Sequence, residues 1–273
     1  MPMRFRIREI ELSILPKKRK ELRILHFSDV HLSPRQQKSM DFIRTWNSLD
    51  PDLVISTGDH ISHPASIPLL VDALGPLLSK PGYFVSGSND YYGPKFKNPI
   101  RYLLPDKGHR IHGPALPIEE LDRQLTSREW INLTQKKLST EIHGLSLELR
   151  GTDDAHLHRD NYTEVSGERS DVDLSIGITH APYQRVLEAM GRDQVDVIFA
   201  GHTHGGQIRL PWFGGTRSLT TNCDLPNWRS RGLTRVNGEP WLHVSAGMGH
   251  NPLTPFRFLS PPEVSLIRLR PKQ

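Results

Sequence analysis

Five short apolar segments in this chain each run directly into a polar loop that carries aspartate, histidine or asparagine. They cover residues 22–27, 53–56, 84–85, 174–178 and 195–199. Apolar segments of this length, separated by helix-like stretches, are typical of buried strands in an α/β fold. Because ligands of α/β sheets bind at the carboxyl ends of the strands, we expect the polar loops to meet at one site.

Hydrophobic patterning along the chain predicts the remaining strands and helices. The predicted strands cover 5–14, 22–27, 52–56, 83–85, 138–142, 145–149, 173–179, 195–200, 241–245 and 264–269. The predicted helices cover 34–49, 67–78, 119–130 and 183–190. Apolar residues alternate on both sides of His143 and Gly144, which predicts an antiparallel hairpin. Parallel and antiparallel pairing together favour a mixed-sheet α/β sandwich over a purely parallel sheet.

The composition excludes several classes of protein. Of the 273 residues, 36% are hydrophobic and 24% are charged, so collagen-like, coiled-coil and wholly disordered chains are excluded. Without internal repeats or a low-complexity linker, residues 1–273 are expected to form a single domain. No apolar run approaches the roughly 20 residues of a membrane span, and the charged first residues lack a secretory apolar core. These features predict a cytoplasmic protein, although a chain trimmed of its leader would look the same.

The polar loops contain seven side chains whose nitrogen and oxygen atoms are common metal ligands. They are Asp29, His31, Asp59, Asn89, His180, His202 and His204. Seven such ligands are too many for one tetrahedral ion, and they suit two adjacent divalent ions that share a bridging carboxylate. Imidazole and carboxylate together favour Mn, Zn or Fe over Ca, and Mn is the ion we expect to activate in vitro. Two such ions can stabilise the attacking and leaving oxygens of a displacement at phosphorus.

At these residues the sequence resembles the calcineurin-like metallophosphoesterase superfamily. The matching motifs are Asp29-Val30-His31, Gly58-Asp59, Gly87-Ser88-Asn89-Asp90, Thr179-His180 and Gly201-His202-Thr203-His204. The tail, residues 247–252 with Arg257 and Phe258, is similar to that of small bacterial phosphoesterases found at membranes. The resemblance implies an α/β fold of the four-layer αββα type, in which two mixed β-sheets are flanked by helices.

The resemblance also implies a role for each ligand. One ion would be held by Asp29, His31 and His204, the other by Asn89, His180 and His202, and Asp59 would bridge them. A hydroxide that bridges the two ions would attack the phosphorus atom. Outside this set, Asp153, Asp154 and His156 are expected to shape a loop at the rim of the site.

The third motif departs from the pattern of the superfamily. Asparagine and then histidine usually follow its glycine, whereas this chain has Ser88 and Asn89 there. Either Asn89 reaches the metal through a shifted loop or Ser88 faces it instead. In both cases the usual histidine, which stabilises the transition state or protonates the leaving oxygen, is absent. The candidate catalytic residues are therefore Asn89, Asp90 and His60. His60 either supports the metal ligand Asp59 without binding the metal itself or is a solvated loop histidine.

These motifs predict a metal-dependent phosphoesterase that hydrolyses a phosphodiester, pyrophosphate or phosphomonoester bond, with a lipid-linked substrate as a refinement. The net charge of +5 suits an anionic partner, and peripheral contact with an anionic membrane is expected. Arginines and aromatic residues gather in one loop-rich stretch, where they either face phosphates and a lipid or base, or form a packed loop. They are Arg209, Arg217, Arg229, Arg231, Arg235, Trp212, Phe213 and Trp228.

Two other functions stay open. A metal-holding regulatory or binding module with weak or lost catalysis would account for the missing motif histidine. A nuclease would need a long basic groove, and the chain has no regular basic stripe, so specific nucleic-acid binding is not expected.

Overall fold

The computed structural model describes residues 5–95, 112–213, 215–235, 238–250 and 256–273. The strands of this part are β1 Arg6–Leu15, β2 Leu22–Phe27, β3 Leu53–Ser56, β4 Gly82–Phe84, β5 Ile131–Asn132, β6 Lys136–Ile142, β7 Leu145–Gly151, β8 Leu174–Thr179, β9 Val197–Ala200, β10 Arg209–Trp212, β11 Gly215–Ser218, β12 Gly232–Thr234, β13 Trp241–Val244 and β14 Glu263–Pro271. The α-helices are α1 Gln37–Thr45, α2 Ser66–Leu74, α3 Ser88–Tyr91, α4 Ile118–Thr126 and α5 Gln184–Arg192.

Two mixed sheets form the centre of the fold. The first has the order β1-β14-β2-β3-β4-β5, and the second has the order β12-β13-β9-β8-β7-β6. Strands β2, β3 and β4 are parallel, and Phe27 pairs with Ser56 while Ser56 pairs with Phe84. In the second sheet β8 and β9 are parallel, and Thr179 pairs with Ala200. Within each sheet, the strands that precede the polar loops therefore end level with one another.

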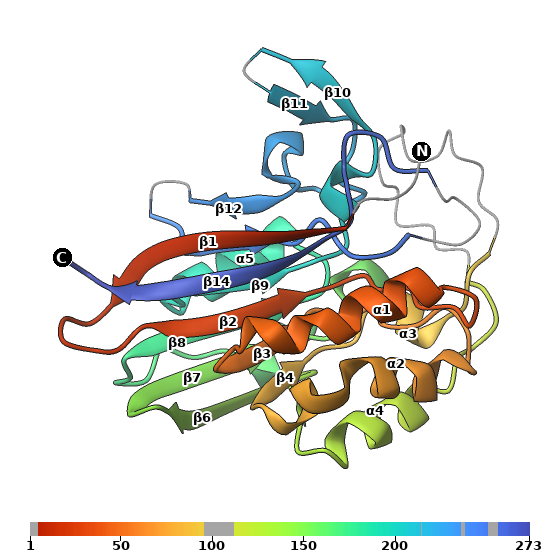
Figure 1. The fold of residues 1–273 in the computed structure, drawn as a ribbon. Coiled ribbons are helices and arrows are strands. Elements are labelled where there is room, and N and C mark those ends of the chain that lie inside the picture. Colours follow the sequence, from red (N-terminus) through yellow and green to blue (C-terminus); the bar gives the residue numbers. More distant parts are fainter. Residues whose placement is uncertain (1–4, 96–111, 214, 236–237, 251–255) are drawn as a thin grey trace.

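The two sheets pack face to face, and helices cover their outer faces (Figure 1). Side chains alternate along β2, so that Leu22 and Ile24 pack toward the second sheet whereas Leu25 and Phe27 pack against α1, α2 and α4. Helix α5 covers the second sheet through an apolar cluster that contains Met190. Strands buried on both faces must be apolar throughout, which is why short apolar runs predicted them. The predicted αββα sandwich is confirmed.

Most of the predicted elements are present. The strand predicted at 22–27 coincides with β2, and the hairpin predicted around residues 143–144 is the antiparallel pair β6–β7. The helix predicted at 34–49 is shorter than expected, because it begins at Gln37 and its last turn, Trp46–Leu49, is a 3-10 helix. Strands β5, β10, β11 and β12 and helix α3 were not predicted, since they have only two to four residues and show no periodic pattern.

The antiparallel hairpin β10–β11 projects from the two sheets (Figure 1). Arg209 pairs with Ser218 at its base, and Trp212 pairs with Gly215 near its tip. The side chains at the tip are open to solvent, with Trp212 57% and Phe213 99% exposed. Among the described residues, no helix combines the length and the apolar character needed to cross a bilayer.

Candidate metal centre

Each predicted ligand lies just beyond the carboxyl end of a strand. Asp29 and His31 follow β2, Asp59 follows β3, Asn89 lies in α3 after β4, His180 follows β8, and His202 and His204 follow β9. The loops of the two sheets contact each other here, because the backbone N–H of His202 donates a hydrogen bond to Oδ2 of Asp29 at 2.9 Å. The expected meeting of the polar loops is therefore present in the structure.

The backbone of these loops is sharply bent. The residues with positive φ include Asp29 at 52°, His31 at 46°, Asp59 at 56°, His202 at 68° and His204 at 50°. This left-handed conformation costs a non-glycine residue about 1–2 kcal/mol, so it persists only where the surroundings fix it. Strained backbone of this kind clusters at functional sites, which agrees with the placement of the ligands.

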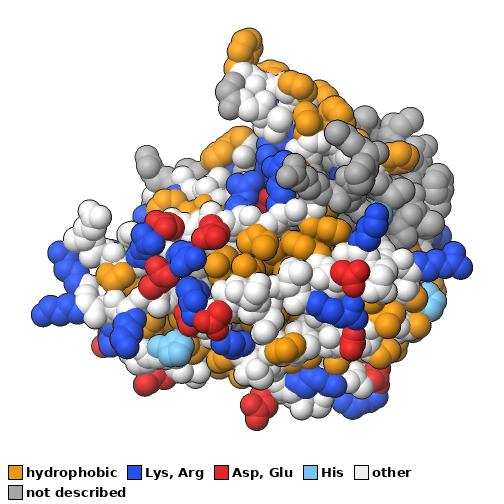
Figure 2. Space-filling model, in the orientation of Figure 1, with side chains coloured by type: hydrophobic (Ala, Val, Ile, Leu, Met, Phe, Trp, Pro, Cys, Tyr) orange, Lys and Arg blue, Asp and Glu red, His pale blue; other side chains and the backbone are white. Residues whose placement is uncertain are grey.

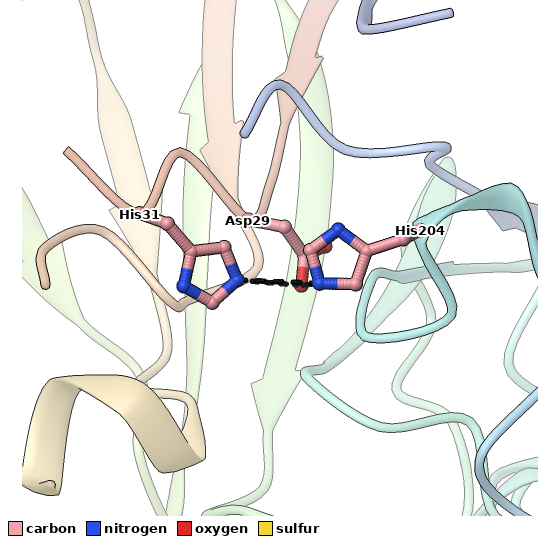
Figure 3. A group of neighbouring side chains, drawn as sticks. All are labelled: Asp29, His31 and His204. Carbon is pink, nitrogen blue, oxygen red and sulfur yellow. Dashed lines mark hydrogen bonds and ion pairs between the residues drawn. The ribbon is translucent and has the colours of Figure 1, made fainter. Parts of the chain in front are cut away.

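Asp29, His31 and His204 form the first cluster of side chains that could hold a metal ion (Figure 3). Nε2 of His31 lies 3.2 Å from Nε2 of His204, and Nε2 of His204 lies 3.6 Å from Oδ1 of Asp29. Oδ1 of Asp29 is buried and has no hydrogen-bond partner within the described part of the chain. Two imidazole nitrogens and a carboxylate oxygen at these distances can share one cation.

Asp29, Asp59 and His180 form the second cluster. Oδ2 of Asp59 lies 3.4 Å from Nε2 of His31 and 3.4 Å from Nε2 of His180, so it stands between the two clusters. His180 donates from Nδ1 to the carbonyl oxygen of Thr57 at 2.6 Å, so Nε2 is the atom that the neutral ring can offer to a cation. Asp59 therefore occupies the place that a bridging carboxylate would take.

His202 belongs to neither cluster. Its Nε2 donates to the carbonyl oxygen of Asn222 at 3.1 Å, and its ring lies edge-on to that of His180 with 5.2 Å between centroids. Donation from Nε2 leaves the lone pair on Nδ1, which is then the atom that His202 can offer to a cation. Asn222 and Thr57 could not be identified from the sequence, because each contributes a main-chain carbonyl, which every residue type has.

In the third motif Asn89, rather than Ser88, contacts the carboxylate between the clusters. The backbone N–H of Asn89 donates to Oδ1 of Asp59 at 2.7 Å, and Nδ2 donates to Oδ2 of Asp59 at 2.7 Å. Oγ of Ser88 accepts a longer hydrogen bond from the same Nδ2, at 3.3 Å. Both Ser88 and Asn89 are half-buried, so this side of the site is accessible to solvent.

Asp90 and His60 lie beneath the site. The fully buried carboxylate of Asp90 accepts hydrogen bonds from the backbone N–H groups of Asp59 at 2.8 Å, His60 at 2.7 Å and Gly87 at 3.0 Å. It also lies 2.9 Å from Nδ1 of His60, whose Nε2 lies 2.7 Å from Oγ of Ser56. His60 is 1% exposed, so the alternative of a solvated loop histidine is wrong. Both side chains hold the loop that carries Asp59.

Burial and charge shift the pKa values of the site in opposite directions. Burial opposes ionisation of Asp59, but His180 and His31 outweigh it and hold the pKa of Asp59 well below its usual value. Burial also opposes protonation of His180, yet Asp59 raises the pKa of His180 well above its usual value. Burial and repulsion from His180 lower the pKa of His202 to about 4, and burial with repulsion from His31 lowers that of His204. His202 and His204 are therefore neutral at pH 7, the form in which imidazole binds metals.

Two further residues lie close to the site. Arg257 donates to the carbonyl oxygens of His204 at 3.1 Å and Gly247 at 2.9 Å, and nothing in the sequence had assigned it a role. Asp154 accepts a hydrogen bond from the backbone N–H of His156 at 2.8 Å, as a residue that shapes a loop does. Burial raises the pKa of Asp154 to about 7, against the opposing charge of His180. Residues 251 and 252 of the tail motif lie outside the described residues.

The residues present fit a pair of divalent cations. Nε2 of His180 and Oδ1 of Asp29 are buried polar atoms that have no hydrogen-bond partner among the described residues. Burying a polar atom without a partner costs about 1–3 kcal/mol, and a bound cation would remove that cost. The mixture of imidazole and carboxylate ligands suits Mn, Zn or Fe.

A sequence model of the calcineurin-like phosphoesterase family matches residues 22–206, a stretch that contains all of these loops. The chain belongs to this family. Membership confirms the resemblance seen in the motifs.

Relatives of the chain also carry metallophosphoesterase names. A bovine transmembrane protein with a metallophosphoesterase domain is 27% identical over 274 residues, which cover 96% of this chain and 56% of the bovine protein. An uncharacterized metallophosphoesterase of Bacillus subtilis is 26% identical over 270 residues, which cover 96% of this chain and 83% of that protein. The chain thus spans little more than half the length of the bovine relative. Among solved structures, an archaeal phosphodiesterase aligns with a TM-score of 0.42 at 16% identity, over 83% of this chain and 85% of the other.

Proposed function

We propose that the protein hydrolyses a phosphodiester, pyrophosphate or phosphomonoester bond with the help of two divalent metal ions. The observation that carries the proposal is the convergence of ligand atoms around Asp59, whose Oδ2 lies 3.4 Å from both His31 and His180. Bound divalent ions would stabilise charge on the phosphoryl oxygens and lower the pKa of water. Asp29, His31 and His204 would hold one ion, Asn89, His180 and His202 the other, and Asp59 would lie between them.

Residues around the metal ligands would position the metal centre and leave room for the substrate to approach. Asn89 and Ser88 are half-buried, so a phosphate ester would approach from their side. Asp90 and His60 are buried and hydrogen-bonded, which supports a positioning role for both, with Asn89 as the candidate that touches the reacting atoms. No histidine is present at residue 88 or 89 to protonate the leaving oxygen.

A manganese-supplemented assay on bis-aryl and mono-aryl phosphates tests the proposal. Wild-type protein is expected to turn over at least one of them, and His202→Ala is expected to abolish that turnover and to lower the metal content. His143→Ala is the matched control, because His143 is a histidine of the β6–β7 turn that is 58% exposed and remote from the ligands in sequence. Metal-replete wild-type protein without turnover on any phosphate ester would instead favour a binding or regulatory module.

Peripheral contact with an anionic membrane is the second part of the proposal. It is supported by the aromatic tip of the β10–β11 hairpin, where Phe213 is 99% exposed. Figure 2 shows hydrophobic side chains on the part of the molecule that projects at the top of the view. Tryptophan and other aromatic rings are favoured at the membrane–water interface, whereas such exposure in water is unfavourable. A lipid-linked phosphate ester is then the refined substrate class. If the wild-type protein does not bind vesicles that contain anionic lipid, this part of the proposal is wrong.

A further inference from the structure

The stretch 209–235 contains five arginines, and four of them have partners in the structure. Arg209 donates to main-chain and hydroxyl oxygens, Arg217 and Arg235 lie over tryptophan rings, and Arg229 pairs with Glu239. Arg231 differs, because it is half-buried and forms no hydrogen bond or ion pair with any other described residue. Its guanidinium group, with five N–H donors, is available to a ligand.

Arg231 lies at the base of the β10–β11 hairpin, next to a second arginine. Arg209, the first residue of β10, donates to Oγ of Ser230 at 2.7 Å, which ties the hairpin base to the residue before Arg231. Nη1 of Arg8, from β1, lies 3.9 Å from the position that a Cβ atom on Gly232 would occupy. Figure 2 shows basic side chains gathered at this place, between the hairpin and the rest of the molecule.

Positive charge predominates around Arg231. Arg8 forms an ion pair at 3.3 Å with the buried carboxylate of Glu263, and the same carboxylate raises the pKa of Arg231 against the effect of burial. Arg209 and Arg257 give their hydrogen bonds to neutral oxygens. Burial lowers the pKa of Arg209 and of Arg257 to about 10, and burial, opposed by Glu263, also lowers that of Arg231. An anion bound here would therefore relieve an excess of half-buried cations.

We propose that Arg231 and Arg8 form a binding site for the phosphate group of an anionic phospholipid, separate from the candidate metal centre. Arginine suits this ligand because its planar fork of donors matches phosphate oxygens. The inference rests on the membrane contact proposed above, and it specifies the lipid phosphate as the group that the protein recognises at the membrane.

The geometry of the hairpin favours a lipid as the source of the phosphate. The three residue steps from Arg209 to Trp212 along β10 span about 10 Å. Interfacial apolar side chains enter a membrane by about 5–10 Å, so a tip inserted to that depth leaves the hairpin base at the level of the headgroups. Arg231 is at that base, and the exposed rings of Trp212 and Phe213 are at the tip.

Flotation of the full chain with vesicles tests the site. The probes are vesicles of phosphatidylcholine alone and of phosphatidylcholine with phosphatidylglycerol. Arg231→Gln is expected to lose about fivefold in affinity for the anionic vesicles, the contribution of one arginine near an anionic surface. Arg235→Gln, in the same segment but with its guanidinium over Trp241, is the matched control and is expected to change little. Phe213→Ser is expected to weaken binding to both kinds of vesicle.

Several outcomes would overturn the site. If Arg231→Gln and Arg235→Gln lose the same affinity for anionic vesicles, the protein is attracted to the membrane by its overall positive charge and not by a specific site. If inorganic phosphate raises the melting temperature of the wild type but not of Arg231→Gln, while vesicle binding is the same in both, the site takes free phosphate rather than lipid. Arg231→Gln is expected to keep wild-type turnover of a soluble aryl phosphodiester, which shows that it is folded. Absence of turnover in the wild type would count against the proposed hydrolysis and would leave the vesicle result intact.

Discussion

Replacing Asp90 by asparagine is expected to destabilise the protein, because the loop after β3 is built around this carboxylate. Oδ2 of Asp90 accepts the backbone N–H groups of Asp59 and Gly87 and lies 2.9 Å from Nδ1 of His60. Oδ1 accepts the backbone N–H of His60 at 2.7 Å. A carboxamide has a single oxygen, so its NH2 group must face at least one of these donors.

The size of the effect follows from these contacts. With the amide oxygen in the place of Oδ2, the NH2 group faces the backbone N–H of His60, and a buried N–H without an acceptor costs about 1–3 kcal/mol. The other three hydrogen bonds change from charge-assisted to neutral, with a loss of about 1 kcal/mol each. Asp90→Asn is therefore expected to lower the free energy of unfolding by about 4–6 kcal/mol, which is large for one substitution.

Urea denaturation followed by circular dichroism measures this loss. Asp41→Asn is the matched control, because Asp41 lies on α1 with its side chain 59% exposed and should change stability by no more than about 0.5 kcal/mol. The metal content of Asp90→Asn should also fall, since the same loop carries Asp59. A variant of wild-type stability and metal content, with an altered pH profile of turnover, would refute the positioning role and favour Asp90 as a proton donor.

Three further predictions follow from the structure. Burial opposes ionisation of Glu148, but hydrogen bonds from Ser170 and Arg150 lower its pKa from 4.5 to about 2. Ionised Glu148 should therefore stabilise the fold by about 3 kcal/mol above pH 4.5, and this contribution should be lost as the pH falls toward 2. The free energies of unfolding of the wild type and of Glu148→Gln, measured by urea titration, should therefore converge at low pH. Gly201→Ala places a methyl group against Oγ of Ser28 and 2.7 Å from Oδ2 of Asp29, so it should weaken metal binding about 10–100-fold. Elemental analysis should then show a lower metal content than in the wild type, whereas Gly191→Ala in α5 should keep the wild-type content. Without a motif histidine, an activated aryl phosphodiester should be hydrolysed much faster than an alkyl one, and comparable rates would contradict this.

The meeting of the polar loops could be predicted from the sequence because two simple rules govern it. A strand buried on both faces is short and wholly apolar, so a residue such as Asp59, directly after the segment 53–56, marks a strand end. Parallel pairing then brings such ends to one edge of the sheet. The orientation of each imidazole could not be predicted, because it depends on main-chain acceptors. The carbonyl of Asn222, which fixes the tautomer of His202, is 20 residues away and could belong to any residue type.

In the third motif, the roles of two neighbouring residues could not be distinguished from the sequence. Asn89 and Asp90 are neighbours of similar size, and both were candidates for catalysis. The structure makes Asn89 half-buried beside Asp59 and leaves Asp90 fully buried under the backbone of the loop. Burial distinguishes their roles, and burial depends on the turn of α3, which at four residues is too short to be read from a pattern. The catalytic and metal-binding assignments, and the single domain over residues 1–273, stay predictions.

The loop after β9 is the element that the candidate metal centre shares with the proposed phospholipid site. The side chain of His204 faces Asp29, while its carbonyl oxygen accepts hydrogen bonds from Arg257 at 3.1 Å and from Ser260 at 2.9 Å. Arg209, at the base of the projecting hairpin, donates to the carbonyl oxygen of Gly205, the residue that follows His204, at 2.9 Å. A phospholipid held beside this loop would bring the membrane surface close to the metal centre without occupying it. That arrangement suits the hydrolysis of a lipid-linked phosphate ester, and each part of it can fail on its own in turnover, metal content or vesicle binding.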